Sequence, residues 1–316
     1  MKKYRIGVDV GGTNIKIALV DLKGEIISSN KVPTRAEMGY EYTITTMKQA
    51  IADLMKETKT NKDSIEGIGF GFPGQIDYKN GIVKNAPNIP GWVDVPIAEV
   101  IEKEFGIPTR VDNDVRCAAL GELNYGAGVG CQNLICITVG TGIGSGLVVN
   151  GKLVRGASNA AGELGHIKLE MTGGPLCGCG DFGCLEAFAS GPAIVALAED
   201  YIKGGKSTKY RELASNEMTP YIVAEAAKQG DVVAKRIFTT MGEYIGLGLT
   251  SVVNLLNPEK IIIGGGVADA GEILLGPIKE TILKRAMPIS GAAVEIVPAK
   301  LGNTAGVIGA SLLIDS

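Results

Sequence analysis

Residues Ile6–Val20 read I-G-V-D-V-G-G-T-N-I-K-I-A-L-V, and residues Ile135–Val149 read I-C-I-T-V-G-T-G-I-G-S-G-L-V-V, 129 positions further on and without a gap. Each segment has an apolar run, a glycine-rich turn and a second apolar run, which is the pattern of two short strands joined by a turn. A repeated hairpin predicts two copies of one structural unit, each contributing a glycine turn to a shared cleft that could hold a polyphosphate. The alternative is a chance similarity between two glycine-rich hairpins.

The glycine turns carry groups suited to phosphates. In the first, Gly11 and Gly12 let backbone N–H groups approach an anion, Thr13 adds a hydroxyl donor, and Asp9 can hold a hydrated magnesium ion. A plain hairpin turn is the alternative for this lone motif. The second turn contains Thr138, Gly140, Thr141 and Gly142.

A third glycine turn, Gly264–Gly265–Gly266, follows the apolar strand expected over Lys260–Ile263. Three glycines there suit a flat ligand group that lies against the backbone, and they equally suit a tight turn from a strand into a helix.

One histidine and three cysteines lie together in Glu163–Glu186, which reads E-L-G-H-I-K-L-E-M-T-G-G-P-L-C-G-C-G-D-F-G-C-L-E. A single imidazole followed by a C-x-C-x4-C cluster supplies four ligands, enough for a closed tetrahedral zinc site. Its ligands would be His166, which is the only histidine of the chain, Cys177, Cys179 and Cys184. A disulfide, or free thiols that act as small apolar side chains, is the alternative. The carboxylates of Glu163 and Glu186, at the two ends, would lie near one another and indicate recognition of a polar group.

The segment Val111-Asp112-Asn113-Asp114-Val115 ends a predicted strand and opens a predicted helix over Val115–Tyr125. Carboxylates and amides at a helix N-terminus are often caps. One residue is enough for a cap, and the sequence offers three, so we expect Asp114 or Asn113 to face a ligand.

Two irregular loops are expected at 71–77 and 85–92, because both are rich in Gly, Pro or amide residues. Either could line a cleft or be a simple connection. Among the helices, Val232–Leu256 is apolar on more than one face, which predicts burial between layers or in a subunit contact.

Composition sets limits on the class of protein. The 316 residues are enough for two domains, and 45% hydrophobic with 21% charged residues describes a soluble globular protein. A net charge of −3 gives no sign of a basic face for nucleic acid or anionic lipid. Because there is no signal peptide and no apolar run of about 18 residues, we expect a cytoplasmic protein that binds neither nucleic acid nor membranes.

Taken together, the motifs resemble the ROK family of bacterial sugar kinases and sugar-responsive repressors, in the actin-like ATPase superfamily. The motifs are D-V-G-G-T from Asp9, V-D-N-D from Val111, V-G-T-G-I-G-S-G from Val139, and G-E-L-G-H followed by C-x-C-G-x-x-G-C-x-E. The resemblance covers essentially the whole chain. It implies an α/β, two-lobed actin-like ATPase (ribonuclease H-like) fold with a duplicated core and an interlobe cleft. The lobes would be residues 1–117 with 303–316, and residues 118–302, which carry the zinc knuckle.

The resemblance also implies a role for each matching residue. Asp114 would be the general base that takes the proton of the sugar hydroxyl. The zinc would be structural. The implied sugar contacts are Gly74, Asn88, Asn113, Asp114, Glu163, His166 and Glu186. The implied nucleotide contacts are Asp9, Gly11, Gly12, Thr13, Thr141, Gly142, Gly265 and Gly266.

The expected reaction is the ATP-dependent phosphorylation of glucose at its 6-hydroxyl, with Mg²⁺ as cofactor, in a homodimer or homotetramer. The alternative substrates are N-acetylmannosamine, N-acetylglucosamine or another hexose such as mannose. A sugar-sensing regulator is a third reading, which we disfavour because the repressors of the family carry a helix-turn-helix domain ahead of the D-x-G-G-T turn, whereas here that turn begins nine residues from the start.

Overall fold

A computed structural model describes residues 3–87, 89–214 and 217–315, and all structural statements below concern these residues. The strands are β1 Tyr4–Val10, β2 Asn14–Asp21, β3 Ile26–Pro33, β4 Ile65–Phe72, β5 Gln75–Asp77, β6 Ile82–Asn85, β7 Val93–Val95, β8 Thr109–Asn113, β9 Leu134–Val139, β10 Ile143–Val149, β11 Lys152–Leu153, β12 Lys260–Gly264 and β13 Glu295–Pro298. The α-helices are α1 Tyr40–Glu57, α2 Ile97–Phe105, α3 Asp114–Tyr125, α4 Leu185–Ala189, α5 Gly191–Lys203, α6 Lys209–Leu213, α7 Pro220–Lys228, α8 Val232–Leu256, α9 Glu272–Arg285, α10 Pro288–Ala293 and α11 Ala305–Ser311.

Two sheets have the same topology. The first runs β3-β2-β1-β4-β8 and the second runs β11-β10-β9-β12-β13, so each places its first strand between its second and fourth. In both sheets the first and fourth strands pair in parallel. The duplication predicted from Ile6–Val20 and Ile135–Val149 is therefore confirmed, since each segment forms the first two strands of one copy.

The chain divides into two compact units, each with its own internal contacts. Unit 1 comprises Met1–Gly130, Gly146–Gly162 and Lys300–Ser316, and unit 2 comprises Cys131–Ser145 and Glu163–Ala299. The lobe division inferred from the resemblance, 1–117 with 303–316 against 118–302, describes functional bodies and stays a prediction.

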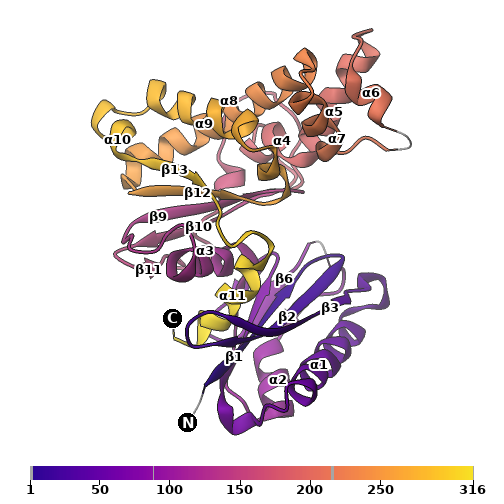
Figure 1. The fold of residues 1–316 in the computed structure, drawn as a ribbon, viewed down its shortest axis with the longest axis vertical. Helices are drawn as coiled ribbons and strands as arrows, with labels where there is room; N and C mark the ends of the chain where they lie inside the picture. The colour runs from indigo at the N-terminus through magenta and orange to yellow at the C-terminus, as the bar shows by residue number, and fades with distance from the viewer. Residues whose placement is uncertain (1–2, 88, 215–216, 316) are drawn as a thin grey trace. The chain divides into compact units, whose positions relative to one another are not determined.

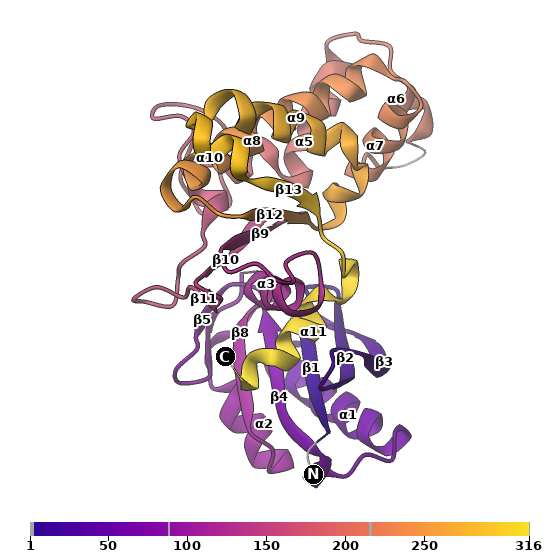
Figure 2. The same ribbon diagram turned by 60° about the vertical axis from the view of Figure 1, so that its left-hand side comes forward.

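In unit 1 the first sheet is covered on both faces (Figures 1 and 2). Helices α1 and α2 pack on one face through buried side chains such as Met47, Leu54 and Ile101. The other face receives α11, which approaches so closely that a Cβ on Gly7 would lie 1.8 Å from the Val307 carbonyl oxygen. Only glycine in the strand permits this contact, because any side chain would separate the helix from the sheet.

The prediction of an irregular loop at 71–77 is partly wrong. Strand β4 continues to Phe72, and β5 forms with β6 and β7 a three-stranded antiparallel sheet. The pairing partners lie 5 to 12 residues apart, in short segments whose composition gave no sign of the ladder.

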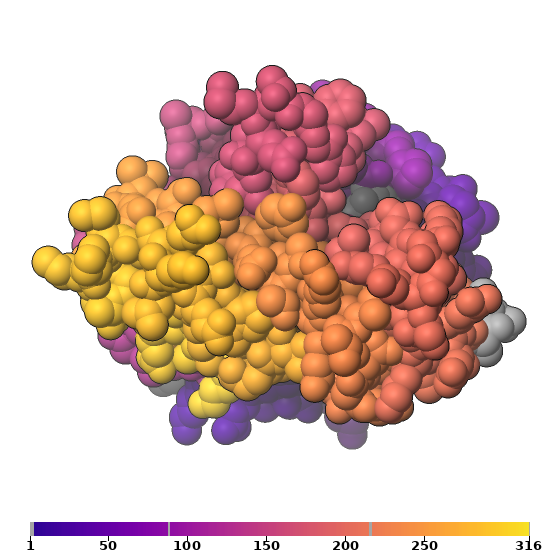
Figure 3. All heavy atoms as spheres, turned by 90° about the horizontal axis from the view of Figure 1, so that it is seen from above, coloured from indigo at the N-terminus to yellow at the C-terminus, as the bar shows by residue number. Residues whose placement is uncertain are grey.

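In unit 2 the helices α8 and α9 pack side by side through the small residues Gly242 and Gly246, which face Pro277 and Thr281. Figure 3 shows the surface formed by α8, α9 and α10, in orange and yellow. The prediction that α8 is buried holds for one face, which carries 11 buried residues of 25. Val232, Leu247 and Leu255 are 78%, 41% and 82% exposed, so the apolar side chains outside that face reach the surface. Among the described residues, no helix combines the length and apolar character needed to span a membrane.

Candidate active site

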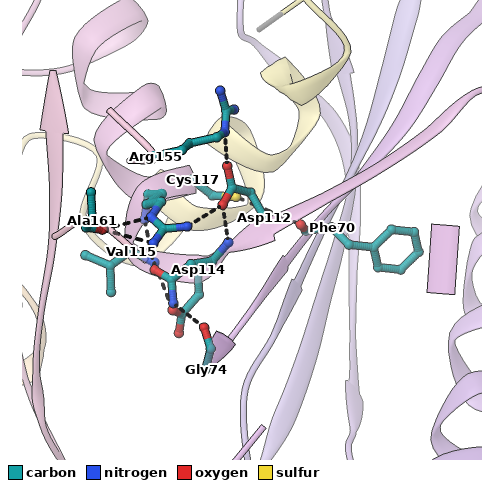
Figure 4. Close-up of polar contacts among 10 residues, drawn as sticks. Phe70, Gly74, Asp112, Asp114, Val115, Cys117, Arg155 and Ala161 are labelled. Carbon is teal, nitrogen blue, oxygen red and sulfur yellow. Dashed lines mark hydrogen bonds and ion pairs between the residues drawn. The ribbon is translucent and has the colours of Figure 1, made fainter. Parts of the chain in front are cut away.

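The turn from β8 into α3 carries Asn113 and Asp114. Asn113 is the helix cap, because its Oδ1 accepts hydrogen bonds from the N–H groups of Val115 (3.0 Å) and Arg116 (3.3 Å). Its Nδ2 donates to the carbonyl oxygen of Gly74 at 3.3 Å, as Figure 4 shows. The structure thus brings together two of the predicted sugar contacts, Gly74 and Asn113. A third, Asn88, lies outside the described residues.

The carboxyl group of Asp114 has an unusual electrostatic environment. Burial raises its pKa from 3.8 to about 6, and the negative charge of Asp9 adds to this rise. Hydrogen bonds to backbone N–H groups, including that of Val115 at 2.9 Å, and the charge of Arg116 oppose it. A carboxylate with such a pKa is largely ionised at neutral pH and still basic enough to accept a proton during a reaction.

Asp112 has a structural role that the sequence did not reveal. Its side chain is fully buried, and it forms ion pairs with Arg116 Nη1 (3.1 Å) and Arg155 Nε (2.7 Å) (Figure 4). The three polar residues of the turn therefore divide into a buried ion-pair partner, a cap and one remaining carboxylate, Asp114. Arg155 was missed because it lies about 40 residues away in sequence, where spacing carries no signal. The four-residue separation of Asp112 and Arg116 could have suggested their pairing.

The first glycine turn places Asp9 at the end of β1. Burial raises the pKa of Asp9, while Lys16, whose Nζ lies 3.6 Å from Oδ2, lowers it. The turn itself is closed by a hydrogen bond from the Gly11 N–H to the Asn14 carbonyl (3.0 Å). Asp9 is thus a largely buried carboxylate beside a lysine, and its oxygens are of the kind that binds magnesium or magnesium-bound water.

The second glycine turn lies beside Glu186. The N–H of Gly140 donates to the Gly142 carbonyl (2.9 Å), and the N–H of Ile143 donates to Glu186 Oε2 (2.8 Å). A Cβ on Gly142 would lie 2.3 Å from that same oxygen. The turn expected to hold phosphate and the carboxylate expected to hold sugar are therefore neighbours within unit 2.

The predicted metal ligands come together. One ligand atom from each of His166, Cys177, Cys179 and Cys184 lies within 4.8 Å of all the others. The Sγ atoms of Cys179 and Cys184 are 3.7 Å apart, and His166 Nδ1 lies 3.7 Å from Cys177 Sγ. Two sulfurs bound tetrahedrally at about 2.3 Å from a zinc ion would lie about 3.8 Å apart, so the donor set and its spacing fit that ion.

The knuckle is shaped by short-range backbone contacts. Leu176 and Phe182 form an antiparallel bridge, and the Cys177 N–H donates to the Asp181 carbonyl at 2.8 Å. Lys168 Nζ donates to Cys184 Sγ at 3.0 Å, so a positive charge lies beside one of the thiols. His166 uses the Nδ1 side of its ring toward the cluster, which leaves Nε2 available to a further partner.

Glu163 precedes the short 3₁₀ helix Leu164–His166, and its backbone carbonyl accepts from the His166 N–H (3.1 Å). Its side chain is exposed. The exposed Glu163 carboxylate therefore lies at the start of this short helix, and the His166 ring, which faces the cysteines, lies at its end.

The third glycine turn requires glycine at Gly265, where φ is +88° and a Cβ would lie 2.4 Å from the Val139 carbonyl oxygen. A small recess beside it is lined in part by Tyr221, Lys228, Gly266 and Asp269. This is the place in unit 2 where a flat group could approach the backbone.

Comparison with known proteins agrees with these features. The model of the ROK family matches residues 5–316. This chain belongs to the ROK family. It is 39% identical over 317 aligned residues to a glucokinase of Halalkalibacterium halodurans, an alignment that covers 99% of this chain and 95% of the relative.

Two further ROK proteins show the range of the family. The crystal structure of a ROK glucokinase from Streptomyces griseus, in complex with glucose and AMPPNP, superposes with a TM-score of 0.84 at 36% identity and covers 98% of both chains. A xylose repressor of Caldicellulosiruptor bescii is 32% identical, with 98% of this chain and 78% of the repressor aligned. The match to the glucokinase structure confirms the expected two-lobed actin-like ATPase fold for this ROK protein.

Proposed function

We propose that this ROK protein is a glucokinase, which transfers the γ-phosphoryl group of ATP to the 6-hydroxyl of glucose. The observation that carries the proposal is the Asp114 carboxyl group, which lies at the start of α3 with a pKa raised to about 6. The identity of 39% to a glucokinase supports glucose as the sugar.

In the proposed reaction, Asp114 accepts the proton of the 6-hydroxyl as the sugar oxygen attacks the γ-phosphorus. A new bond forms between that oxygen and phosphorus, the bond from phosphorus to the β,γ-bridging oxygen breaks, and ADP leaves. The protein's work is mainly alignment and charge stabilisation. Asn113 and Gly74, already hydrogen-bonded to each other, hold the sugar next to the base.

The nucleotide is assigned to the glycine turns. Gly11, Gly12 and Thr13 in unit 1, with Thr141 and Gly142 in unit 2, offer N–H and hydroxyl donors to the phosphates, and Gly265 with Gly266 receives the nucleoside. Asp9 would hold a magnesium ion, directly or through its bound water, and that ion would supply charge neutralisation for the phosphates. The proposed lobes, 1–117 with 303–316 and 118–302, close on the sugar and exclude water.

His166, Cys177, Cys179 and Cys184 are assigned to a structural zinc ion. These four side chains would fill all four positions of a tetrahedral ion, so the ion would hold the knuckle together and bind no substrate. Glu186 and Glu163 then contact sugar hydroxyls, and His166 Nε2 contacts another. ATP is a cytoplasmic metabolite, which is our reason for assigning the protein to the cytoplasm.

Self-association is assigned to an apolar surface on unit 2. Leu255 at the end of α8, Met287 before α10 and Ile289 within α10 are 82%, 64% and 85% exposed. The N–H of Met287 donates to Asn254 Oδ1 at 2.8 Å, so the end of α8 and the start of α10 are neighbours. A homodimer or homotetramer would cover these side chains, and light scattering of the Ile289→Asp variant should then show a smaller molar mass.

The test of the proposed function is a panel of sugars and donors. Purified protein is given glucose, mannose, N-acetylglucosamine and N-acetylmannosamine, each with ATP or polyphosphate, and product is measured directly. We expect the highest kcat/KM with glucose and ATP. A higher value with an N-acetylhexosamine would reassign the substrate, and no turnover with any sugar would refute a kinase.

A further inference from the structure

Helix α3, which begins at Asp114, carries two buried charged side chains. Arg116 is 3% exposed and Glu122 is fully buried. Charged groups are rarely buried unless their hydrogen-bonding capacity is satisfied, because removal from water is costly. The partners of these two residues therefore indicate what each one does.

Arg116 binds two parts of unit 1 at once. Its Nη1 pairs with Asp112 at 3.1 Å, while Nη2 and Nε donate to the carbonyl oxygen of Ala161 at 2.9 and 3.3 Å (Figure 4). Asp112 is also held by Arg155, at 2.7 Å. The guanidinium of Arg116 thus connects the end of β8 to Ala161. Ala161 lies one residue before Gly162, the last residue of unit 1 before the chain continues into unit 2.

Glu122 binds two other parts of unit 1. Its Oε2 accepts from the N–H groups of Ala127 (2.7 Å) and Lys300 (3.1 Å), and Oε1 accepts from the N–H of Leu301 (2.7 Å). Ala127 lies just before the chain first leaves unit 1, after Gly130, and Lys300 is the residue at which the chain returns for the last time. One carboxylate therefore holds both segments through backbone groups.

The chain passes between the units four times, after residues 130, 145, 162 and 299. Glu122 binds the segment that leads to Gly130 and the segment that begins at Lys300. Arg116 binds the segment that leads to Gly162. We propose that α3 ties unit 1 together and that Arg116 and Glu122 are positioning residues, which keep the unit 1 ends of these three segments in register with Asp114.

The catalytic consequence rests on the proposed function. Under that function the sugar is held by residues of unit 1 and by Glu163, which follows Ala161 by two positions. Loosening these segments should therefore weaken sugar binding and couple ATP hydrolysis less tightly to bound sugar, because Asp114 and the residues that hold the sugar lose their common support. The chemical step itself, which needs Asp114, should change less.

The first experiment is hydrogen exchange measured by mass spectrometry on the full-length protein, a readout that needs no activity. We expect Glu122→Gln to speed exchange at Ala127, Lys300 and Leu301, because an amide cannot accept from all three N–H groups. Arg116→Lys should speed exchange over 155–163 and leave the Glu122 sites unchanged, since lysine keeps the charge beside Asp112 but lacks the fork that reaches Ala161. Arg110→Gln, which removes an exposed charge on β8, is the matched control.

The second experiment is steady-state kinetics on the same variants. We expect KM for glucose to rise about tenfold in Glu122→Gln and Arg116→Lys, with kcat within about threefold of the parent, and sugar-independent ATP hydrolysis to increase. Arg110→Gln should match the parent. If Glu122→Gln does not fold, Glu122→Asp tests the same point, since it keeps the charge and shortens the reach.

Folded Glu122 and Arg116 variants with the parent's exchange pattern would overturn the proposal. So would altered exchange accompanied by unchanged KM and unchanged sugar-independent hydrolysis. If the parent protein phosphorylates no sugar, the proposed function fails, whereas the exchange data still decide whether α3 ties these segments of unit 1 together.

Discussion

Glu186 accepts a 2.8 Å hydrogen bond from the backbone N–H of Ile143, the residue that directly follows the second glycine turn. Its other oxygen lies 3.7 Å from Cys177 Sγ. One carboxylate therefore links the metal cluster to the turn assigned to phosphate, so that disturbance of either should be felt by the other.

Replacement of Glu186 by glutamine should impair both substrates. The amide can accept on one side only, so either the Ile143 contact or the contact to sugar is lost. We expect KM for glucose to rise about tenfold, with a smaller rise in KM for ATP. Initial-rate kinetics measure both, with Glu199→Gln on the exposed face of α5 as control. An unchanged KM for glucose would remove Glu186 from the sugar site.

Loss of the metal should first affect sugar binding. We expect about one zinc per chain in the purified protein and a lower content in Cys179→Ser, which removes an accessible ligand. Isothermal titration calorimetry follows glucose binding without turnover. Weaker binding in Cys179→Ser than in Cys131→Ser is the expected result. A metal-free protein that binds glucose normally would contradict the assigned role.

The raised pKa of Asp114 sets the pH dependence of the reaction. Because the base must be ionised, kcat/KM should fall as pH drops through about 6. A profile that stays flat down to pH 5 would exclude Asp114 as the titrating base.

The raised pKa of Asp114 also affects the stability of the protein. A salt-bridged carboxylate, whose pKa is lowered, adds stability as pH rises, whereas Asp114 removes it. The folded protein binds the Asp114 proton more tightly than the unfolded chain does, so this group lowers stability as pH rises from about 4 to about 6. Asp114→Asn should therefore stabilise the protein by about 1 to 3 kcal/mol at pH 8 and by much less at pH 4. Thermal unfolding at both pH values tests this, and an equal effect at both would contradict it.

The contact of α11 with the first sheet predicts a large packing effect at Gly7. A methyl group there would lie 1.8 Å from the Val307 carbonyl oxygen, so helix and strand must separate. We expect Gly7→Ala to destabilise the protein by about 3 kcal/mol or more. Gly276→Ala is the matched control, because α9 leaves its Cβ position open and alanine favours helix there. Similar melting temperatures for the two variants would contradict this packing.

The sequence predicted the features that depend on local pattern. The repeat at Ile6–Val20 and Ile135–Val149 led to the duplicated sheets, and the spacing of His166 with the three cysteines led to a cluster that the structure brings together. Both follow from short segments in which periodicity or spacing decides the outcome.

The features that it could not predict depend on distant partners. Asp112 and Asp114 are both aspartates of the same turn, so the sequence does not distinguish them. Their roles differ because Arg155 forms an ion pair with Asp112. The anchoring by Glu122 depends on Lys300 and Leu301, nearly 180 residues away. The ladder of β5, β6 and β7 was missed for another reason: its partners are only 5 to 12 residues apart, but they lie in short segments without a strand pattern.

The central claim is that Asp114 is the base of a glucose-phosphorylating enzyme. Its most direct test is the kcat of Asp114→Asn with glucose and ATP, measured beside glucose binding by isothermal titration calorimetry. We predict that kcat falls by about 10² to 10⁴ while the glucose dissociation constant stays within about threefold of the parent. A variant that keeps more than about a tenth of the parent's kcat would contradict the account.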